Sequence, residues 1–489
     1  MVTIRSVNLT HPNQPKDEYI CCMELHLFDK QIYTDRRYTL KQNIGQDGII
    51  LLLGNEDSSM NYKDNCYPFR QDSSFLYYFG LDVAGLAGII DTDTGEEVIF
   101  GNELTIDDIV WTGTLPTVSE MASIVGITHT RPYNQIIHYI HKALIAGRKV
   151  HILPPYRPEN KIKLAEWFNT SLDDVTDYIS VKLIKAVISQ RVIKTPPEIA
   201  EMEKAVSISV DMMMEVIQHT RPGIKEYELV AKAHEVAIAN NSRLGYPAII
   251  TIHGQTLHTH YYGNTLQEGR MVLSDIGAEN AMHYGGDLTR TFPVGKTFTN
   301  RQKELYEVVL SAMDHAISML KPGSRYKDIH LAACCKLVEG LTQAGLMKGD
   351  AEEAVAAGAH TMFFQCGLGH MLGMDTHDME DLGEPYVGYT DTLQKETSVF
   401  GLKSLRLGRE LEAGFVLTVE PGIYIIPELI DRWQAEKKYV DFINYDVLNT
   451  YRDFGGIRIE DNFLITDSGH KLLGKYLPKT LKEIEALKG

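Results

Sequence analysis

Short apolar runs alternate with stretches of helical spacing over the first 185 residues. The runs at 48–53, 84–91 and 149–153 are rich in isoleucine, leucine and valine, which is typical of buried strands. Helical stretches separate these runs, and this alternation is expected of an α/β domain. The pattern therefore predicts a smaller α/β domain over residues 1–185.

A long amphipathic helix is predicted to begin at Pro196, because two prolines followed by acidic residues are typical of a helix N-terminus. Apolar residues then recur every three or four positions along one face: Ile199, Met202, Val206, Val210, Met213 and Ile217. We place the domain boundary near residue 186, so that the second and larger domain covers residues 186–489.

The second domain contains an internal repeat. The segments TRPGIKEYELVAKA from Thr220 and LKPGSRYKDIHLAA from Leu320 lie 100 residues apart, and each places Pro-Gly after a helical stretch. Thr299 and Gln302 have the spacing of a capping box at the start of the second helix. The apolar stripe of that helix comprises Leu305, Val309, Met313, Ala316 and Leu320. Two related halves are predicted.

The repeat extends to two strands that each end in an acid. The segments GRMVLSDIG from Gly269 and GFVLTVEPG from Gly414 place Asp275 and Glu420 six residues after the first glycine. Both acids follow β-branched or apolar residues that favour a buried strand. A carboxylate buried at the end of such a strand needs a partner.

A second acid, Asp287, follows Asp275 across the segment IGAENAMHYGG, whose polar and glycine residues suit a hairpin. We predict that the two flanking strands run antiparallel and carry both acids on one face. Two adjacent carboxylates repel each other unless a cation lies between them. Taken alone, the pair is more often a solvated hairpin, so its meaning depends on other residues.

Charge narrows the classes of partner. The chain has 48 basic and 65 acidic residues, a formal charge of -17, which repels nucleic-acid phosphates and anionic lipid. We therefore expect no nucleic acid and no membrane surface as partner. No apolar segment of signal-peptide length follows Met1, and no run approaches the roughly 18 apolar residues of a membrane span. These features predict a cytoplasmic protein.

The six cysteines contain no C-x-x-C pair and are expected to be reduced thiols without a chemical role. They are Cys21, Cys22, Cys66, Cys334, Cys335 and Cys366. Hydrophobic residues make up 44% of the chain and charged residues 23%, which is ordinary for a packed globular protein.

Three further residues give the acidic pair a chemical meaning. His370 lies in CGLGHMLGMDTHD, Glu420 in LTVEPG and Glu460 in GGIRIED. Together with Asp275 and Asp287 they supply one imidazole and four carboxylates. This oxygen-rich set suits divalent manganese, with cobalt or zinc as alternatives. Because carboxylates can bridge, five such ligands can hold two ions.

These motifs resemble the proline-specific branch of the pita-bread metallopeptidases, aminopeptidase P and prolidase. The segments that carry the resemblance are LSDIGAE, GGDLTRTFP, GLGHMLGMDTHD, VLTVEPGIY and GGIRIEDNFLIT. In addition, YPFRQDSSFLYYFGL from Tyr67 resembles the accessory domain of aminopeptidase P, and RVIKTPPEIAEM from Arg191 resembles the entry to its catalytic domain. The resemblance implies a pita-bread catalytic domain with an internal pseudo-twofold duplication over residues 186–489. The α/β accessory domain over residues 1–185 would narrow the mouth of the active site.

The resemblance also implies roles for the five ligands. Asp275 and Asp287 would hold one metal ion, Asp287 and Glu460 would bridge the two ions, and His370 and Glu420 would complete the second site. Glu420 would also accept a proton during hydrolysis. The activity implied is two-metal hydrolysis of the bond between an N-terminal residue and proline.

Three residues outside the ligand set match substrate-side positions of the family. His258 and His377 correspond to histidines that contact the substrate and stabilise the tetrahedral intermediate, and Arg406 corresponds to a substrate-side arginine of prolidase. An isolated histidine is more often a core or surface residue, and only the spacing to the ligands favours the catalytic interpretation. His260 lies close enough to His258 to compete for the assignment.

The sequence leaves the substrate open. The segment from Tyr67 favours an Xaa-Pro aminopeptidase, whereas Arg406 and the long segment between Glu420 and Glu460 favour a prolidase that cleaves only dipeptides. A third hypothesis is a catalytically silent pita-bread protein that acts as a binding module. Family members form dimers or larger assemblies, so a homodimer is expected.

Two features depart from the family pattern. Asp275 and Asp287 are 12 positions apart where 11 is usual, and a longer hairpin or a bulge can absorb the extra residue. Cys366 stands where the family often has the first histidine of an H-G-x-G-H run. Neither change removes one of the five ligands.

Overall fold

The computed structural model of the chain describes residues 25–489, which divide into two compact units at Gln190 and Arg191. Helix α7 (Val181–Arg191) spans the predicted boundary near residue 186. Cys21, Cys22 and the N-terminal residues that favour a cytoplasmic location lie outside the described residues. The four described cysteines form no disulfide with one another.

The first unit is built on a mixed five-stranded sheet of order β4-β3-β2-β1-β5. Its strands are β1 (Ile49–Leu53), β2 (Ala87–Asp91), β3 (Glu97–Phe100), β4 (His129–Arg131) and β5 (Val150–His151). Its other helices are α1 (Lys30–Ile44), α2 (Ser73–Phe79), α3 (Ile106–Thr112), α4 (Val118–Ile124), α5 (Ile136–Ile145), α6 (Pro158–Phe168) and the 3₁₀ turns η1 (Tyr133–Gln135) and η2 (Asp174–Tyr178). Three strands occupy the three predicted apolar runs, and their inward side chains form a buried core with α5 and α6.

The second unit carries ten short strands and nine helices among residues 191–489. The strands are β6 (Arg243–Leu244), β7 (Ile249–Thr251), β8 (Met271–Ile276), β9 (Ala278–Glu279), β10 (Leu288–Pro293), β11 (Val416–Val419), β12 (Gly422–Tyr424), β13 (Gly456–Arg458), β14 (Asp461–Ile465) and β15 (His470–Leu472). The helices are α8 (Pro196–His219), α9 (Glu226–Ala239), α10 (Asn300–Ser318), α11 (Tyr326–Gln343), α12 (Ala351–Ala357), α13 (Glu384–Val387), α14 (Pro427–Ala435), α15 (Tyr445–Leu448) and α16 (Leu481–Leu487). Four 3₁₀ turns complete the unit: η3 (Ala359–Met362), η4 (Glu380–Leu382), η5 (Leu402–Ser404) and η6 (Asn449–Tyr451).

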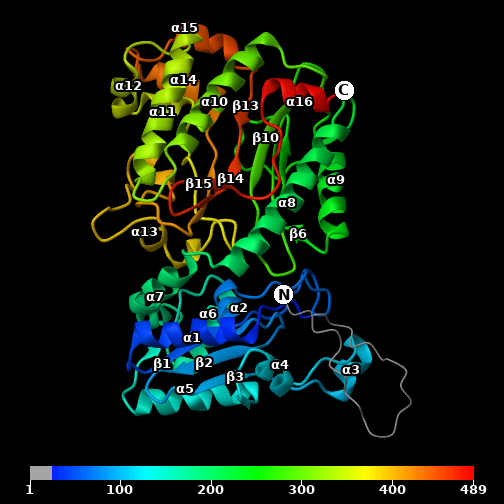
Figure 1. Ribbon diagram of the computed structural model, residues 1–489, viewed down its shortest axis with the longest axis vertical. Helices are drawn as coiled ribbons and strands as arrows, with labels where there is room; N and C mark the ends of the chain where they lie inside the picture. The colour runs from blue at the N-terminus through cyan, green and yellow to red at the C-terminus, as the bar shows by residue number, and fades with distance from the viewer. Residues whose placement is uncertain (1–24) are drawn as a thin grey trace. The chain divides into compact units, whose positions relative to one another are not determined.

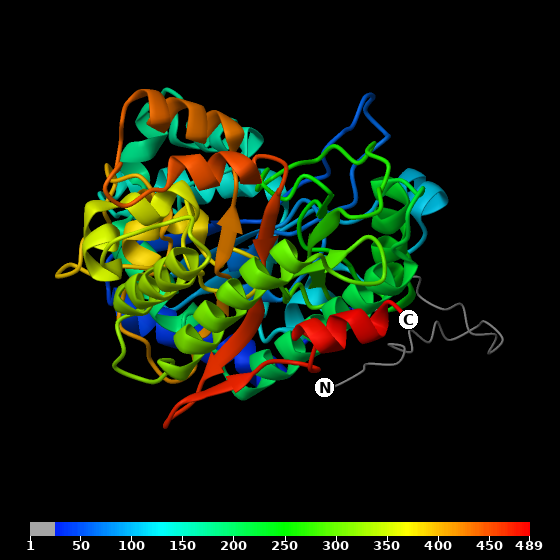
Figure 2. The same cartoon turned by 90° about the horizontal axis from the view of Figure 1, so that it is seen from above.

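The two predicted halves are visible in the packing of this unit. Helices α8 and α9 pack together and cover strands β7, β8 and β10, while α10 packs on α11 and covers strands β11, β12 and β13 (Figures 1 and 2). Gly223 N donates to Leu266 O at 2.9 Å, and Gly323 N donates to Leu411 O at 2.8 Å. The two bonds join corresponding residues of the repeat, so the predicted duplication is confirmed at the level of single contacts.

The predicted hairpin between the first two acids is confirmed. Strands β8 and β10 pair antiparallel, with Asp275 opposite Thr289. Residues two apart in a strand share a face, so Asp287, two positions before Thr289, lies on the same face as Asp275. A Cβ at Gly277 would stand 1.8 Å from the carbonyl oxygen of Gly286. Glycine at this position therefore permits the close approach of the hairpin arms.

Strand register also brings the two glutamates together. Strand β11 pairs with β14 through Val419 and Asp461, and β12 pairs with β13 through Gly422 and Arg458. Both ladders follow one register, which places Glu420 opposite Glu460. The two halves then meet where Glu460 N donates to Thr289 O at 3.0 Å.

Arg290 of β10 stabilises the contact between the two halves. Its buried guanidinium donates to Asp461 Oδ1 at 2.6 Å, to Glu460 O at 2.7 Å and to Pro478 O at 2.9 Å. The arginine thus ties the first-half strand to the second-half strand and to the C-terminal segment. Removal of the guanidinium would leave buried acceptors without their donor.

We predict that Arg290→Met lowers the stability of this unit by about 3 kcal/mol, because the substitution breaks a buried ion pair and several hydrogen bonds at once. Scanning calorimetry should show the transition of this unit at a lower temperature. The control is Arg432→Met on α14, whose exposed side chain makes a single ion pair with Glu436. That variant should change stability by no more than about 0.5 kcal/mol. Equal effects of the two substitutions would contradict the role of Arg290.

Candidate metal centre

The two aspartates of the hairpin converge on one hydroxyl group. Tyr246 OH faces both Asp275 Oδ1 and Asp287 Oδ1 at hydrogen-bond distance. Burial, followed by the charges of the two aspartates, holds the pKa of Tyr246 well above its usual value, so its hydroxyl remains a donor. One hydroxyl carries one proton, so it can donate to only one of the two carboxylates at a time. The pair therefore needs a further source of positive charge.

His370 reaches the same cluster from the segment beside β11. Thr418 N donates to His370 O at 3.0 Å, which fixes the backbone of the histidine against that strand. Its Nδ1 lies 3.0 Å from Met371 O, an arrangement that places a proton on Nδ1 and turns Nε2 toward the carboxylates. His370 Nε2 lies 3.3 Å from Asp287 Oδ2 and 3.5 Å from Glu420 Oε1. Burial lowers the pKa of His370, but the two carboxylates outweigh it and raise the value.

The two glutamates complete the cluster. Ligand atoms of Asp287, His370 and Glu460 lie within 4.8 Å of one another, and all three residues are buried. Glu460 Oε2 accepts from Thr289 Oγ1 at 2.7 Å, whereas Glu460 Oε1 is buried without a hydrogen-bond partner among residues 25–489. Burial raises the pKa of Glu420 to about 6 and raises that of Glu460 well above its ordinary value.

Arg458 is a residue of the site that our sequence analysis missed. Its Nη2 donates to Asp275 Oδ2 at 2.5 Å, its Nε to Thr289 Oγ1 at 3.1 Å and its Nη1 to Tyr424 OH at 2.8 Å. Arg458 precedes Glu460 by two positions, so the alternation of a strand could have indicated that both face the centre. The guanidinium orients Asp275 and neutralises one negative charge.

The donor set fits divalent metal ions. Four carboxylates, of which Asp275, Asp287 and Glu460 are buried and Glu420 is partly exposed, face one arginine and one histidine, so the cluster keeps an excess of negative charge in a region of low dielectric constant. The unpaired Glu460 Oε1 points to the same conclusion, since a buried carboxylate oxygen requires a hydrogen bond or a cation. Oxygen ligands with a single imidazole suit hard or borderline divalent ions. All five residues predicted from the sequence are brought together.

The substrate-side residues lie at the edge of the cluster. The His377 ring centroid lies 4.4 Å from that of His370, and His377 Nδ1 is 2.5 Å from Glu380 Oε2. His258 is exposed on one side; partial burial lowers its pKa, and the charges of Arg458 and Asp275 also act on it. His258 is therefore near the first aspartate without a direct bond to it.

Arg406 belongs to a charged group beside His377. Its Nε lies 3.4 Å from Glu380 Oε2 and 3.5 Å from Glu384 Oε1, and Lys395 contacts Glu384. A hydrogen bond from His377, with help from Arg406, lowers the pKa of Glu380 to about 2, so this carboxylate is ionised. Glu380 was not predicted from the sequence, because its role depends on the positions of His377 and Arg406 in the folded chain.

The two departures from the family pattern leave the cluster intact. The longer connection between the aspartates forms a small bridged loop in which Glu279 pairs with Gly285. Cys366 lies beside Tyr424, with its Sγ 3.9 Å from the hydroxyl oxygen, and burial raises the pKa of its thiol to about 12. Cys366 is therefore a neutral neighbour of the centre.

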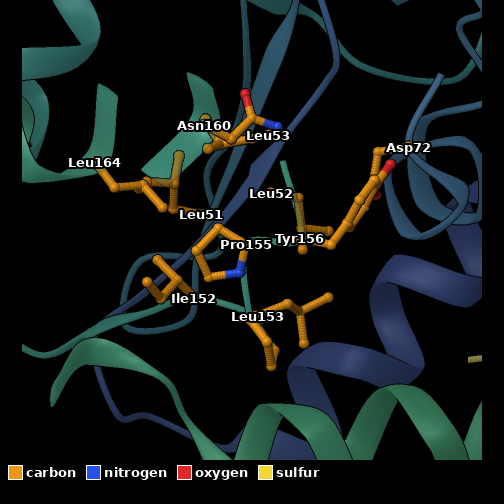
Figure 3. A pocket seen from close by; sticks show the side chains of 11 residues that line it. Leu51, Leu52, Leu53, Asp72, Ile152, Leu153, Pro155, Tyr156, Asn160 and Leu164 are labelled. Atoms are coloured by element: carbon orange, nitrogen blue, oxygen red, sulfur yellow. The ribbon is translucent and has the colours of Figure 1, made fainter. Parts of the chain in front are cut away.

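A cavity in the first unit is a poor candidate for a substrate site. It encloses about 40 Å³ and is lined mainly by apolar side chains, among them Leu51, Ile152 and Leu164 (Figure 3). Asp72 also borders it, but one oxygen of this carboxylate caps helix α2. A volume of this size holds a few water molecules rather than a peptide. Within residues 25–489 no helix is both long enough and apolar enough to cross a membrane.

Comparison with known proteins gives two family matches. The model of metallopeptidase family M24 matches residues 200–467, and that of the aminopeptidase P N-terminal domain matches residues 33–153. The Xaa-Pro dipeptidase of Homo sapiens is 31% identical over 90% of this chain and 88% of its own length. A probable Xaa-Pro aminopeptidase of Sordaria macrospora is 32% identical over 91% of this chain and 92% of its own length.

Solved structures show the same relationship. Aminopeptidase PepP of Pseudomonas aeruginosa superposes with a TM-score of 0.78 at 27% identity, over 94% of this chain and 98% of its own. Zinc-substituted aminopeptidase P of Escherichia coli in complex with product superposes with a TM-score of 0.77 at 26% identity, over 95% of this chain and 99% of its own. The predicted pita-bread fold is thereby confirmed.

We predict that Arg458→Met destabilises the metal-free protein by about 3 kcal/mol, because the four clustered carboxylates then repel one another without their cation. Saturating divalent metal should restore most of this loss, since the ions neutralise the same carboxylates. Thermal unfolding with chelator and with metal measures both effects. Arg409→Met, which removes an arginine paired with Glu412 outside the centre, is the control. An equal loss with and without metal would show that Arg458 acts only through packing.

Proposed function

The chain belongs to metallopeptidase family M24, and from this membership we propose that it is an Xaa-Pro aminopeptidase. It is a peptidase whose curated relatives bear the names Xaa-Pro dipeptidase and Xaa-Pro aminopeptidase. Our proposal is that it releases the N-terminal residue from peptides that carry proline in the second position. The observation that favours an aminopeptidase over a dipeptidase is the pairing of Arg406 with two carboxylates.

The five clustered side chains would hold two divalent ions: Asp275, Asp287, His370, Glu420 and Glu460. Asp287 is proposed to bridge the two ions, because one of its carboxylate oxygens faces Tyr246 and the other faces His370. Bound there, two such ions would supply Lewis-acid chemistry, polarising the scissile carbonyl and making water a stronger nucleophile. Manganese is the proposed metal, since four of the five ligands are hard oxygen donors.

Three side chains of this protein are proposed to carry out the other steps of hydrolysis. Glu420 is proposed to accept a proton and return it to the leaving proline nitrogen, because its carboxylate lies beside His370 at the edge of the cluster. His377, oriented by Glu380, is proposed to contact the substrate and to stabilise the tetrahedral intermediate. His258 is proposed to contact the substrate from the exposed side.

The ion pairs of Arg406 affect the length of substrate that we expect the enzyme to accept. An enzyme confined to dipeptides must capture the free carboxylate next to proline with an available cation. In this chain Arg406 faces Glu380 and Glu384, so a substrate carboxylate would have to displace an anion that is already present. A longer peptide carries no charge at that point and avoids this competition.

The second candidate is an Xaa-Pro dipeptidase. Arg406 supports it, because this cation acts on the pKa of both His258 and His377 and is therefore near the residues proposed to contact substrate. The similarity to the human Xaa-Pro dipeptidase supports it equally. A silent binding module is the remaining alternative, and it would gain support if the manganese-loaded protein cleaved no Xaa-Pro peptide. The cytoplasmic location, the homodimer and the accessory role of the first unit stay predictions.

We predict that the tetrapeptide Ala-Pro-Ala-Ala is cleaved with a higher kcat/KM than the dipeptide Ala-Pro. The variant Glu380→Gln keeps an acceptor for His377 but removes one negative charge beside Arg406. It should raise the ratio of dipeptide to tetrapeptide kcat/KM about tenfold, which corresponds to ~1.4 kcal/mol. The control is Asp381→Asn, which removes the charge of the adjacent exposed residue. Preference for Ala-Pro in the wild type would identify a dipeptidase.

We predict that Asp287→Ala abolishes binding of both ions of this centre, because the substitution removes the proposed bridging anion and leaves two cations poorly screened. Manganese content after gel filtration, measured by mass spectrometry, should fall from about two ions per chain to nearly none. Asp446→Ala, at an exposed aspartate of the same unit, should retain both ions. Two tightly held manganese ions in the Asp287 variant would refute the bridging role.

A further inference from the structure

A second group of metal-ligand side chains lies in the same unit and shares no residue with the carboxylate centre. It consists of His330 and Cys334 on helix α11 and His360 on η3. Their ligand atoms lie within 4.8 Å of one another, and all three side chains are buried. The fold therefore brings together two imidazoles and one thiol from segments that are 26 or more residues apart in sequence.

The spacing of His330 and Cys334 on α11 explains why these two side chains lie together. Residues four apart on a helix share a face, so His330 and Cys334 project together from the buried side of the helix. His330 Nε2 lies 3.6 Å from Cys334 Sγ. Ligand atoms around a tetrahedral zinc ion are separated by about 3.3 to 3.8 Å, given the usual zinc–nitrogen and zinc–sulfur bond lengths. The observed separation already meets this requirement.

Both imidazoles have an unsatisfied nitrogen. His330 Nδ1 and His360 Nδ1 are buried and have no hydrogen-bond partner among residues 25–489. Buried polar atoms of this kind are rare, and each requires an explanation. Because Nε2 is the nitrogen of His330 that faces Cys334, an unsatisfied Nδ1 favours a bound ion only at His360. Burial lowers the pKa of His330 to about 3 and that of His360 to about 4, so both rings are neutral at physiological pH and each retains a lone pair.

We propose that His330, Cys334 and His360 form a structural zinc site, separate from the peptidase centre. One nitrogen of each imidazole and the Cys334 sulfur bind the ion, and a water molecule or a neighbouring group takes the fourth position. Binding replaces the sulfur–hydrogen bond by a sulfur–zinc bond and releases the thiol proton to solvent. Burial raises the pKa of the Cys334 thiol well above its usual value, so the ion has to drive this deprotonation.

The chemistry of the three ligands selects against the ions of the carboxylate centre. A thiolate with two imidazoles is a soft to borderline set that suits zinc, whereas manganese prefers oxygen donors. Phe364 adds an apolar wall, with its ring centroid 5.8 Å from that of His330. A site so enclosed is loaded most readily while the chain folds.

The position of the site suggests what it stabilises. Residues 363–370 lead from η3 to the metal ligand His370, and Phe363 O accepts from Tyr424 N at 2.8 Å. An ion that joins α11 to η3 therefore anchors the start of the segment that carries His370. Loss of the ion should lower the thermal stability of the second unit and weaken the catalytic centre only indirectly.

The test uses full-length protein synthesised in a cobalt-supplemented, zinc-depleted medium. A thiolate bound to cobalt gives an intense near-ultraviolet charge-transfer band, which ligation by carboxylates and imidazole alone does not produce. We expect this band in the wild type and in Asp287→Ala, which lacks the bridging ligand of the catalytic centre. Cys334→Ala should abolish the band. His360→Phe, which keeps the bulk of the ring, should abolish it as well and serves if Cys334→Ala fails to fold.

Two other cysteines serve as controls that show whether Cys334 provides the metal-bound sulfur. Cys335→Ala changes the next residue of the same helix, and Cys366→Ala changes the cysteine beside Tyr424. Both variants should retain the band. In zinc-containing medium, Asp287→Ala should retain about one zinc ion per chain, and Asp287→Ala combined with Cys334→Ala should retain none. A cobalt-loaded wild type without the band, or a band that survives Cys334→Ala, would overturn the proposal.

Discussion

Four carboxylates, three of them buried, that gather where the strands of three small sheets meet are the constraint on which the catalytic unit depends. Each is costly to bury as an anion, and together they repel one another. The chain offers one arginine, Arg458, and one histidine, His370, as local cations or hydrogen-bond donors. The remaining negative charge has to be neutralised by bound metal ions or by protonation. Folding of this unit and its capacity for metal are therefore two aspects of one electrostatic problem.

The duplicated strands determine where the four carboxylates lie. In each half a strand ends in an acid, and a paired strand places a second acid on the same face. Because the four carboxylates stand on or beside paired strands rather than on long loops, their separations are set by strand register. The bond from Glu460 N to Thr289 O and the interactions of Arg290 then lock the two registers together. The geometry of the centre thus depends on how the small sheets of both halves are joined.

The sequence allowed prediction of the hairpin, the repeat and the five residues that cluster, because each depends on local pattern or on the order of motifs. The contacts that tune the centre were harder to predict. Arg458 meets Asp275 across 183 residues, and Tyr246 reaches the hairpin from a segment without a distinctive pattern. The pairing of Arg406 with Glu380 likewise depends on the course of an irregular loop. Such contacts depend on tertiary structure, which hydrophobic periodicity does not describe.

The unit separates two kinds of ligand in space. Oxygen donors gather at the strand ends, where manganese or a similar hard ion is suited, and the buried thiol and imidazoles gather between α11 and η3, where zinc is suited. Affinity alone would favour zinc over manganese at most sites, so a chain with both proposed sites would have to rely on ligand type and access. A soft site that captures its ion during folding leaves the hard centre to exchange ions with solvent afterwards. The division also explains why a cysteine such as Cys366 can stand beside the carboxylate centre without joining it: its thiol remains neutral, and the oxygen ligands already present bind a hard ion more favourably.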